Sequence, residues 1–256
     1  MREWVLSEQN HAFIRSRKWE VVMIPFGATE PHNLHMPYGT DNYQLEEISQ
    51  KSCELAYKRG AAVLCLPVVP FGINTNYMKI PGSLACSLNP TTLYAIIGDL
   101  IEAMSQQGVR KIVLLNGHGG NELKPALREF HLRSKAFVCL CDWYRIGIDR
   151  QKEIFKDPGD HAGELESSLG MAFFPQFMKP ELADEGKVRA TRFKAISEGW
   201  INITRPWHLA TTNTGAGDPS AASADKGHAY MDVVTERLSN FLVELAASPF
   251  DDNFPY

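Results

Sequence analysis

The sequence predicts an α/β fold, a single-domain three-layer α/β/α sandwich with a mostly parallel sheet. Short apolar runs rich in β-branched residues alternate with longer helical patterns along the chain. No linker, internal repeat or low-complexity stretch divides the 256 residues. Strand–helix alternation of this kind places helices on both faces of a largely parallel sheet.

Four apolar runs are the expected strands, and helical patterns lie between them. The expected strands cover residues 20–25, 62–69, 111–115 and 136–141, and the expected helices cover residues 43–58, 90–107, 123–133, 163–173 and 221–246. Asn89 followed by Pro90 is typical of a helix start, with Asn as the cap and Pro as the first helical residue. Gly60 and Gly108 stand where glycines commonly end helices.

Residues 174–214 form the longest stretch without a regular pattern. The stretch contains several prolines and two aromatic residues, Trp200 and Trp207, that we expect to be exposed. A connection of this length inside a compact domain commonly has a function of its own. We therefore predict an irregular insertion that acts as a lid or as an interface.

Composition excludes several classes of protein. The formal charge of −4, without a cluster of Lys and Arg, argues against a nucleic-acid-binding protein. No apolar run approaches the roughly 20 residues that span a bilayer, and the N-terminus lacks the apolar region of a signal peptide. The five cysteines are an odd, scattered set, which indicates free thiols in a reducing compartment. We expect a cytoplasmic protein without membrane or nucleic-acid partners.

A first group of polar residues follows the strand expected at residues 20–25. Glu30, His32 and Asp41 would lie at the carboxyl end of that strand, where open α/β sheets form their ligand sites. Carboxylate oxygens and imidazole nitrogens are the donors that Zn, Mn and Fe accept. The segment therefore predicts a metal site.

A glycine-rich segment, residues 115–121, follows the strand expected at 111–115. His118 lies in its middle and would point into the same crevice as Glu30. Free N–H groups near Gly119 and Gly120 would favour an anion or a developing oxyanion. A nucleotide-binding loop is the competing interpretation, but Glu122 occupies the place of its third glycine.

The third polar segment covers residues 160–168. Glu164 and Glu166 suit the first turn of a helix, and their spacing of two places them on different faces. They are therefore expected to have different roles. His161, just before the helix and with a carboxylate nearby, is a candidate proton shuttle.

Together the three segments resemble the motifs of the creatininase (creatinine amidohydrolase) family. That family carries G-[SA]-T-E-x-H-x-x-H-x-P-x-x-x-D, N-G-H-G-G-N and H-A-G-x-x-E-[TS]-S, which stand here at residues 27–41, 116–121 and 161–168. The order and spacing of the motifs agree over nearly the full length. The resemblance implies one creatininase-like domain over residues 1–256.

The resemblance also implies two divalent metal ions (Zn, Mn or Fe). Its matched ligands are Glu30, His32, Asp41 and His118, with Asp41 bridging the pair, and Glu166 is our candidate for the fifth position. In creatininase itself, the second metal is bound by a Glu at the position that is Gly120 here. Because this chain lacks that Glu, Glu164 and Glu122 remain alternatives to Glu166 as the fifth ligand. His35 matches a family His that supports the ligands without binding metal.

The activity implied is hydrolysis of a C–N bond in a small cyclic amide or formamide, creatinine or a similar compound, by a hydroxide that two metals activate. His161, oriented by an adjacent carboxylate, would carry the proton to the leaving nitrogen. Gly119, Gly120 and Trp143 would face the substrate, with Tyr144 or Trp207 as further candidates for the pocket wall. The alternatives are a non-catalytic metal-binding or small-molecule-binding protein, or a family peptidase or deformylase. Family members often form hexamers, so a homo-oligomer is expected.

Overall fold

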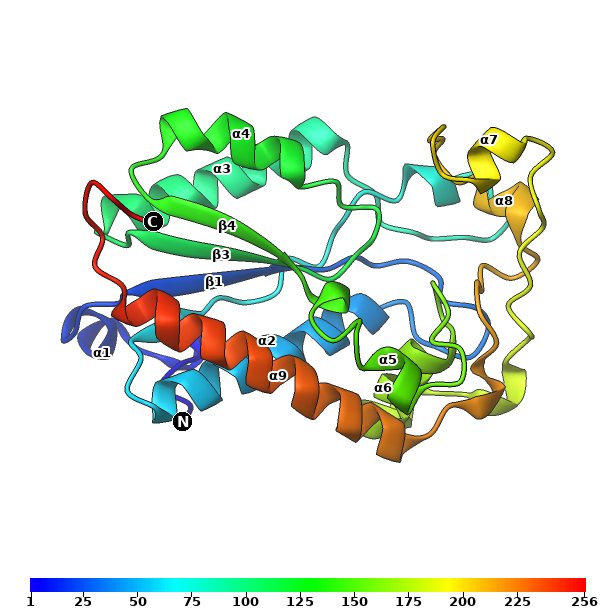
Figure 1. Ribbon diagram of the computed structural model, residues 1–256, viewed down its shortest axis with the longest axis horizontal. Helices are drawn as coiled ribbons and strands as arrows, with labels where there is room; N and C mark the ends of the chain where they lie inside the picture. Colours follow the sequence, from blue (N-terminus) through cyan, green and yellow to red (C-terminus); the bar gives the residue numbers. More distant parts are fainter.

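A four-stranded parallel sheet forms the centre of the computed structural model, which describes residues 1–256 (Figure 1). All three strand pairings are parallel, and the spatial order is β2-β1-β3-β4. The strands are β1 (Val21–Phe26), β2 (Val63–Cys65), β3 (Lys111–Asn116) and β4 (Phe137–Asp142). The predicted three-layer α/β/α fold with a parallel sheet is confirmed.

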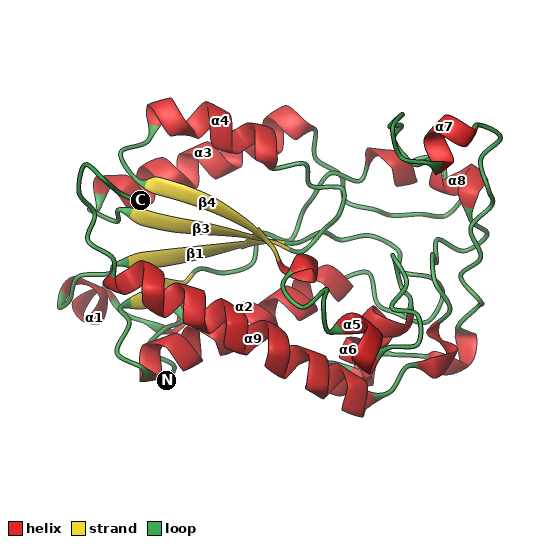
Figure 2. Ribbon diagram, in the orientation of Figure 1, coloured by secondary structure: helices red, strands yellow, loops and turns green.

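Helices cover both faces of the sheet (Figure 2). One face carries α3 (Pro90–Gln106) and α4 (Lys124–Arg133), and the other carries α2 (Thr40–Lys58) and α9 (Ala224–Ala247). Because side chains alternate along a strand, Val21 and Met23 of β1 pack in the core on the α2 and α9 side. Val22 and Ile24 pack in the second core, on the α3 and α4 side. Burial on both faces explains why β1 and β3 are continuous apolar runs in the sequence.

The remaining helical elements lie in the connections between these layers. The further α-helices are α1 (His11–Arg15), α5 (Gln151–Ile154), α6 (Glu164–Phe173), α7 (Lys194–Ser197) and α8 (Trp207–Ala210). Single 3-10 turns are η1 (Leu6–Glu8), η2 (Thr75–Tyr77), η3 (Trp143–Arg145), η4 (Pro175–Phe177), η5 (Pro180–Leu182) and η6 (Pro219–Ala221). None of the helices is both long and apolar enough to cross a membrane.

Three elements begin or end elsewhere than the sequence indicated. β2 ends at Cys65 rather than near residue 69, since Pro67 has no N–H to continue the ladder. α9 begins at Ala224 rather than 221, because Ser223 caps it by accepting a hydrogen bond from the Lys226 N–H. α2 begins at Thr40, three residues earlier than expected, which places Asp41 in its first turn.

The register of the two central strands brings the motifs together. β1 and β3 end side by side, with Phe26 paired to Asn116, and the Gly117 N–H donates to the Phe26 carbonyl oxygen at 2.9 Å. The Asn116 side-chain amide donates to Asp142 Oδ1 at 3.0 Å, which ties in the end of β4. The loops after β1 and β3 therefore emerge next to each other at one edge of the sheet.

Residues 174–214 contain only short helices and turns, as predicted, and lie beyond the carboxyl ends of the strands, at the right of Figure 1. Trp200 is 68% exposed, and Phe193 and Leu209 are also exposed. Trp207 is only 5% exposed, so our expectation for that residue is wrong: its ring stacks on Tyr77. The role of the segment as a lid or interface stays a prediction.

Candidate metal centre

Five predicted metal ligands meet in one cluster at the carboxyl edge of the sheet. Glu30 and His32 come from the loop after β1, Asp41 from the first turn of α2, His118 from the loop after β3 and Glu166 from the first turn of α6. Four are buried and Glu166 is half-buried. Their donor atoms form two groups, each with its atoms within 4.8 Å of one another: Glu30, Asp41 and His118 in one, and His32, Asp41 and Glu166 in the other.

Asp41 belongs to both groups, and each of its two carboxylate oxygens faces one of them. Its Oδ1 lies 3.1 Å from His32 Nε2, and its Oδ2 lies 3.2 Å from His118 Nδ1. A single carboxylate that faces two separate donor sets can offer one oxygen to each of two ions. This is the arrangement expected of a bridging ligand.

The two imidazoles present lone pairs to the centre. His32 Nδ1 lies 3.2 Å from the Glu30 carbonyl oxygen, and His118 Nε2 lies 3.1 Å from the Ile73 carbonyl oxygen. Because a carbonyl oxygen only accepts, these ring nitrogens carry the hydrogens, and the opposite nitrogens are free to bind a metal. This second-nitrogen hydrogen bond is typical of histidines that bind metals.

Buried carboxylate oxygens that receive no hydrogen bond also suit a cation-binding site. Glu30 Oε2 and Asp41 Oδ2 are buried and have no hydrogen-bond partner. His118 Nδ1 faces Asp41 Oδ2 across 3.2 Å, so two acceptors meet unless a proton or a cation lies between them. Three carboxylates and neutral imidazoles are a donor set that suits two divalent ions of the Zn, Mn or Fe type.

The concentration of charge shifts the pKa values of several groups of the cluster. Burial lowers the pKa of His32, but the adjacent carboxylate of Asp41 outweighs it and raises that pKa to about 10. Burial, together with the carboxylates of Asp41 and Glu30, raises the pKa of Glu166 to about 7. Metal ions would displace these protons, because the ligands bind in their deprotonated forms.

Of the three candidates for the fifth ligand, only Glu166 joins the cluster. Its Oε2 also accepts a hydrogen bond from the Ala162 N–H at 2.6 Å. Glu164 forms a buried ion pair with Lys226 and accepts from the Asp157 N–H at 2.9 Å, so its carboxylate is used elsewhere. Glu122 is exposed. The expectation that Glu164 and Glu166 have different roles agrees with this geometry.

The backbone at Gly120 leaves no room for a ligand there. A Cβ at this position would overlap the His118 ring and the Ile73 carbonyl oxygen. Gly119 has open space around its Cα, and no protein group accepts from the N–H of either glycine. Glu166 instead reaches His32 and Asp41 from α6.

The pair Glu166 and Glu164 offers a matched test of the fifth ligand. We expect Glu166→Gln to bind one metal ion per chain in place of two, because an amide is a weaker metal ligand than a carboxylate. Glu164→Gln should keep both metals and lose only thermal stability, since its partner Lys226 would be left unpaired. Metal content by elemental analysis and melting temperature separate the two outcomes. Full occupancy in Glu166→Gln would remove Glu166 from the ligand set.

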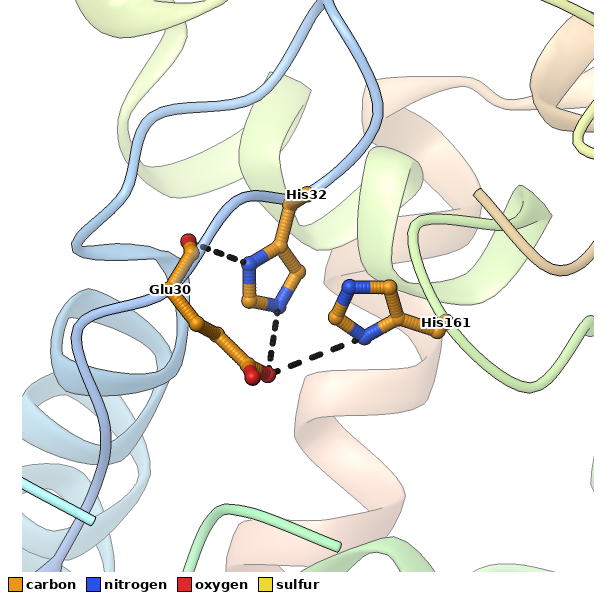
Figure 3. A group of neighbouring side chains, drawn as sticks. All are labelled: Glu30, His32 and His161. Atoms are coloured by element: carbon orange, nitrogen blue, oxygen red, sulfur yellow. Dashed lines mark hydrogen bonds and ion pairs between the residues drawn. The ribbon is translucent and has the colours of Figure 1, made fainter. Parts of the chain in front are cut away.

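His161, the predicted proton shuttle, lies against the cluster (Figure 3). Its Nδ1 lies 3.8 Å from Glu30 Oε1, and its Nε2 lies 3.0 Å from the Pro31 carbonyl oxygen. The hydrogen therefore sits on Nε2, and the lone pair of Nδ1 faces the centre. Burial and the neighbouring His32 lower the pKa of His161 to about 4. A neutral imidazole aimed at the centre can accept a proton there.

The group that orients His161 differs from the one expected. We expected an adjacent carboxylate, but Asp160 forms an ion pair with Arg205 instead, at 2.5 Å. The Pro31 carbonyl oxygen takes the orienting role. His35 lies outside the ligand groups, as predicted, and its Nε2 lies 2.7 Å from Ser167 Oγ.

Trp143 does not wall the site. It is 1% exposed and packs in the hydrophobic core, with its ring 6.4 Å from that of Tyr230. Tyr144 packs at the border of the same core. The prediction that Trp143 faces the substrate is therefore wrong: the residue follows β4, but its side chain turns into the layer beneath α9.

Tyr77 contacts the centre although no sequence pattern indicated it. Its hydroxyl lies 3.2 Å from His161 Nε2, and its ring stacks on Trp207 with 5.0 Å between centroids. It belongs to η2, in the long connection between β2 and α3. A lone Tyr in an irregular segment carries no periodicity or spacing, so only the fold reveals its place.

Comparison with known proteins agrees with this geometry. The family model described as creatinine amidohydrolase (Creatininase) matches residues 8–242. A solved structure from Bacteroides fragilis NCTC 9343, named as a candidate creatinine amidohydrolase, is 31% identical, with a TM-score of 0.91 over 98% of this chain and 100% of that one. The creatinine amidohydrolase of Pseudomonas putida is 23% identical over 88% of this chain and 89% of that protein.

A further relative carries a different name. The 3-dehydro-scyllo-inosose hydrolase of Thermotoga maritima is 28% identical over 66% of this chain and 55% of that protein, so the match spans little more than half the length of that relative. The family model covers most of the chain, and the B. fragilis structure covers nearly all of it. The chain belongs to the creatininase (creatinine amidohydrolase) family.

Proposed function

We propose that this protein is a metal-dependent amidohydrolase that cleaves a C–N bond of a small cyclic amide or formamide, creatinine or a similar compound. The observation that carries the proposal is the position of Asp41, whose two oxygens face two separate sets of metal donors. Membership of the creatininase family supports the same reaction class.

Two divalent ions would be held by five side chains. Glu30 and His118 would bind one ion, His32 and Glu166 the other, and Asp41 both. A solved creatininase that is 20% identical and shares the fold, with a TM-score of 0.76, is a manganese form. When bound, such a metal pair activates water and polarises the carbonyl group of the substrate.

The remaining groups of the site would move the proton and hold the substrate. Water adds to the amide carbon, the C–N bond breaks, and the leaving nitrogen receives a proton. His161 suits this transfer, because its Nδ1 faces the centre while the Pro31 carbonyl oxygen holds its Nε2–H. The free N–H groups of Gly119 and Gly120 are candidates to hydrogen-bond the substrate carbonyl oxygen.

The enclosed character of the centre favours a small substrate. Glu30 and His32 are at most 1% exposed, and the buried rings of Tyr77 and Trp207 lie next to His161. The relatives named above act on creatinine and on an inosose, which are both small molecules by name.

Metal removal followed by a substrate panel tests the proposal. We expect the metal-loaded protein to hydrolyse at least one compound among creatinine, other lactams, formamides and short peptides. Dialysis against a chelator should abolish turnover, and Zn or Mn should restore it, because the buried carboxylates need the ions. Ammonia or amine release is measured with and without metal. Undiminished turnover in a metal-free preparation would overturn the mechanism.

The same panel separates the two alternatives. Hydrolysis confined to peptides would make the protein a family peptidase. Full metal occupancy without turnover of any panel compound would favour a non-catalytic binding protein with the same fold.

A further inference from the structure

The side chains of the metal cluster offer acceptors to a substrate but no hydrogens. The carboxylates of Glu30, Asp41 and Glu166 accept only. The three imidazoles each give their ring N–H to a backbone carbonyl oxygen. These acceptors are the carbonyl oxygens of Glu30 for His32, Ile73 for His118 and Pro31 for His161. Amide hydrolysis, however, develops negative charge on the carbonyl oxygen, which hydrogen-bond donors stabilise.

Tyr77 has the unused hydrogen that the cluster lacks. Its hydroxyl oxygen lies 3.2 Å from His161 Nε2, a nitrogen that already carries a hydrogen because it bonds to Pro31. The phenol oxygen can only accept from that N–H, so its own hydrogen is not consumed in this contact. The further acceptor beside this hydroxyl is the carboxylate of Glu30, a proposed metal ligand that a bound ion would engage instead. The hydrogen is therefore available to a group that enters the site.

Burial keeps that hydrogen in place. Tyr77 is 1% exposed, and a phenolate at this position would be poorly hydrated, so the hydroxyl stays protonated. The group is thus a fixed neutral donor rather than a base.

Two aromatic contacts fix the position of the phenol. The Trp207 ring stacks on the Tyr77 ring at 5.0 Å with 24° between the planes, and also lies 4.9 Å from the His161 ring. Arg205 holds Trp207 in turn, with its guanidinium carbon 4.6 Å from the indole ring and an ion pair to Asp160. A donor held in this way needs little reorganisation when charge develops, which is the condition for effective transition-state stabilisation.

We propose that Tyr77 is a further catalytic residue, whose hydroxyl donates a hydrogen bond to the oxyanion that develops on the substrate carbonyl oxygen. Tyr77 keeps its proton throughout, and the proton for the leaving nitrogen still travels through His161. This inference rests on the proposed amide hydrolysis. This catalytic role differs from a structural one, because the hydrogen bond stabilises the transition state only when the carbonyl oxygen becomes negative.

The first test compares Tyr77→Phe with Tyr230→Phe. Tyr230 is a buried tyrosine in the core, and its hydroxyl bonds to Gln151, so Tyr230→Phe removes the same group away from the site. We expect Tyr77→Phe to lower kcat about 10²–10³-fold with little change in KM, metal content or melting temperature. Tyr230→Phe should keep kcat. Unchanged kcat in Tyr77→Phe would overturn the proposal.

A second test does not depend on the identity of the substrate. Acetohydroxamate presents a negatively charged oxygen to metal centres, and its affinity for the Mn-loaded protein can be measured by calorimetry. We expect Tyr77→Phe to bind it about 10-fold more weakly, the effect of one lost hydrogen bond to a charged group. Equal affinity in wild type and variant would overturn the donor role, even if the panel yields no substrate and the amidohydrolase proposal fails.

Metal content distinguishes one remaining role for Tyr77. If Tyr77→Phe loses metal while its kcat per bound metal and its affinity for acetohydroxamate stay those of the wild type, the hydroxyl supports the ligand Glu30 instead. That result would also overturn the proposal.

Discussion

Replacing Asp41 with alanine is expected to remove both metal ions and to lower kcat/KM by at least about 10³-fold. Each oxygen of this carboxylate faces a different donor set, so the substitution takes one ligand from both ions at once. It also leaves His32 and His118 without the acceptor that faces them. Loss of groups that merely orient ligands already weakens metal binding about 10–100-fold, and a shared ligand should matter more.

Metal content by elemental analysis and turnover of the best panel substrate measure this effect. Asp225→Ala is the matched control, because Asp225 is an exposed aspartate in the first turn of α9, as Asp41 is in the first turn of α2. The control should keep both metals and full activity. Two bound metals in Asp41→Ala would show that Asp41 is no bridge.

For His161→Ala we expect both metals to remain bound and kcat to fall about 10²–10⁴-fold, the usual contribution of a positioned acid–base group. The two donor groups that share Asp41 do not include His161. Its Nδ1 faces the centre at 3.8 Å from Glu30 Oε1, near enough to exchange a proton with a group that is bound there. Added imidazole should restore part of the turnover, since the substitution leaves a space of that shape.

His131→Ala is the control for this variant, because His131 is an exposed histidine at the end of α4. Normal turnover in His161→Ala would remove His161 from the catalytic role. Loss of one metal would instead make it a ligand, a role that its grouping with Glu30 and His32 allows geometrically.

Local pattern predicted the framework of this fold well. β1, β3 and β4 lie within one residue of their predicted positions. β1 and β3 are buried throughout, and strands buried on both faces must be apolar throughout. Gly60 and Gly108 adopt positive φ angles of 89° and 84° just after α2 and α3, as helix-ending glycines do. β2 was predicted too long, since an apolar run does not show where Pro67 interrupts pairing.

Side-chain direction was predicted less well. Trp143 and Trp207 both lie in irregular segments, where residue spacing does not show which way a side chain points. Trp143 turns into the core, whereas Trp207 packs on His161 and Tyr77 beside the metal centre. Both placements depend on contacts with residues far away in the chain.

The sequence by itself determined the parallel α/β fold and the candidates Glu30, His32, Asp41 and His118, because motifs that follow strands of one parallel sheet must meet at its carboxyl edge. Only the tertiary structure placed Glu166, and not Glu164 or Glu122, beside His32 and Asp41, and only it placed Tyr77 beside His161. The physical reason is that short-range spacing shows which residues share an element. Which of their atoms meet depends on how α6 and the connection between β2 and α3 pack against the sheet.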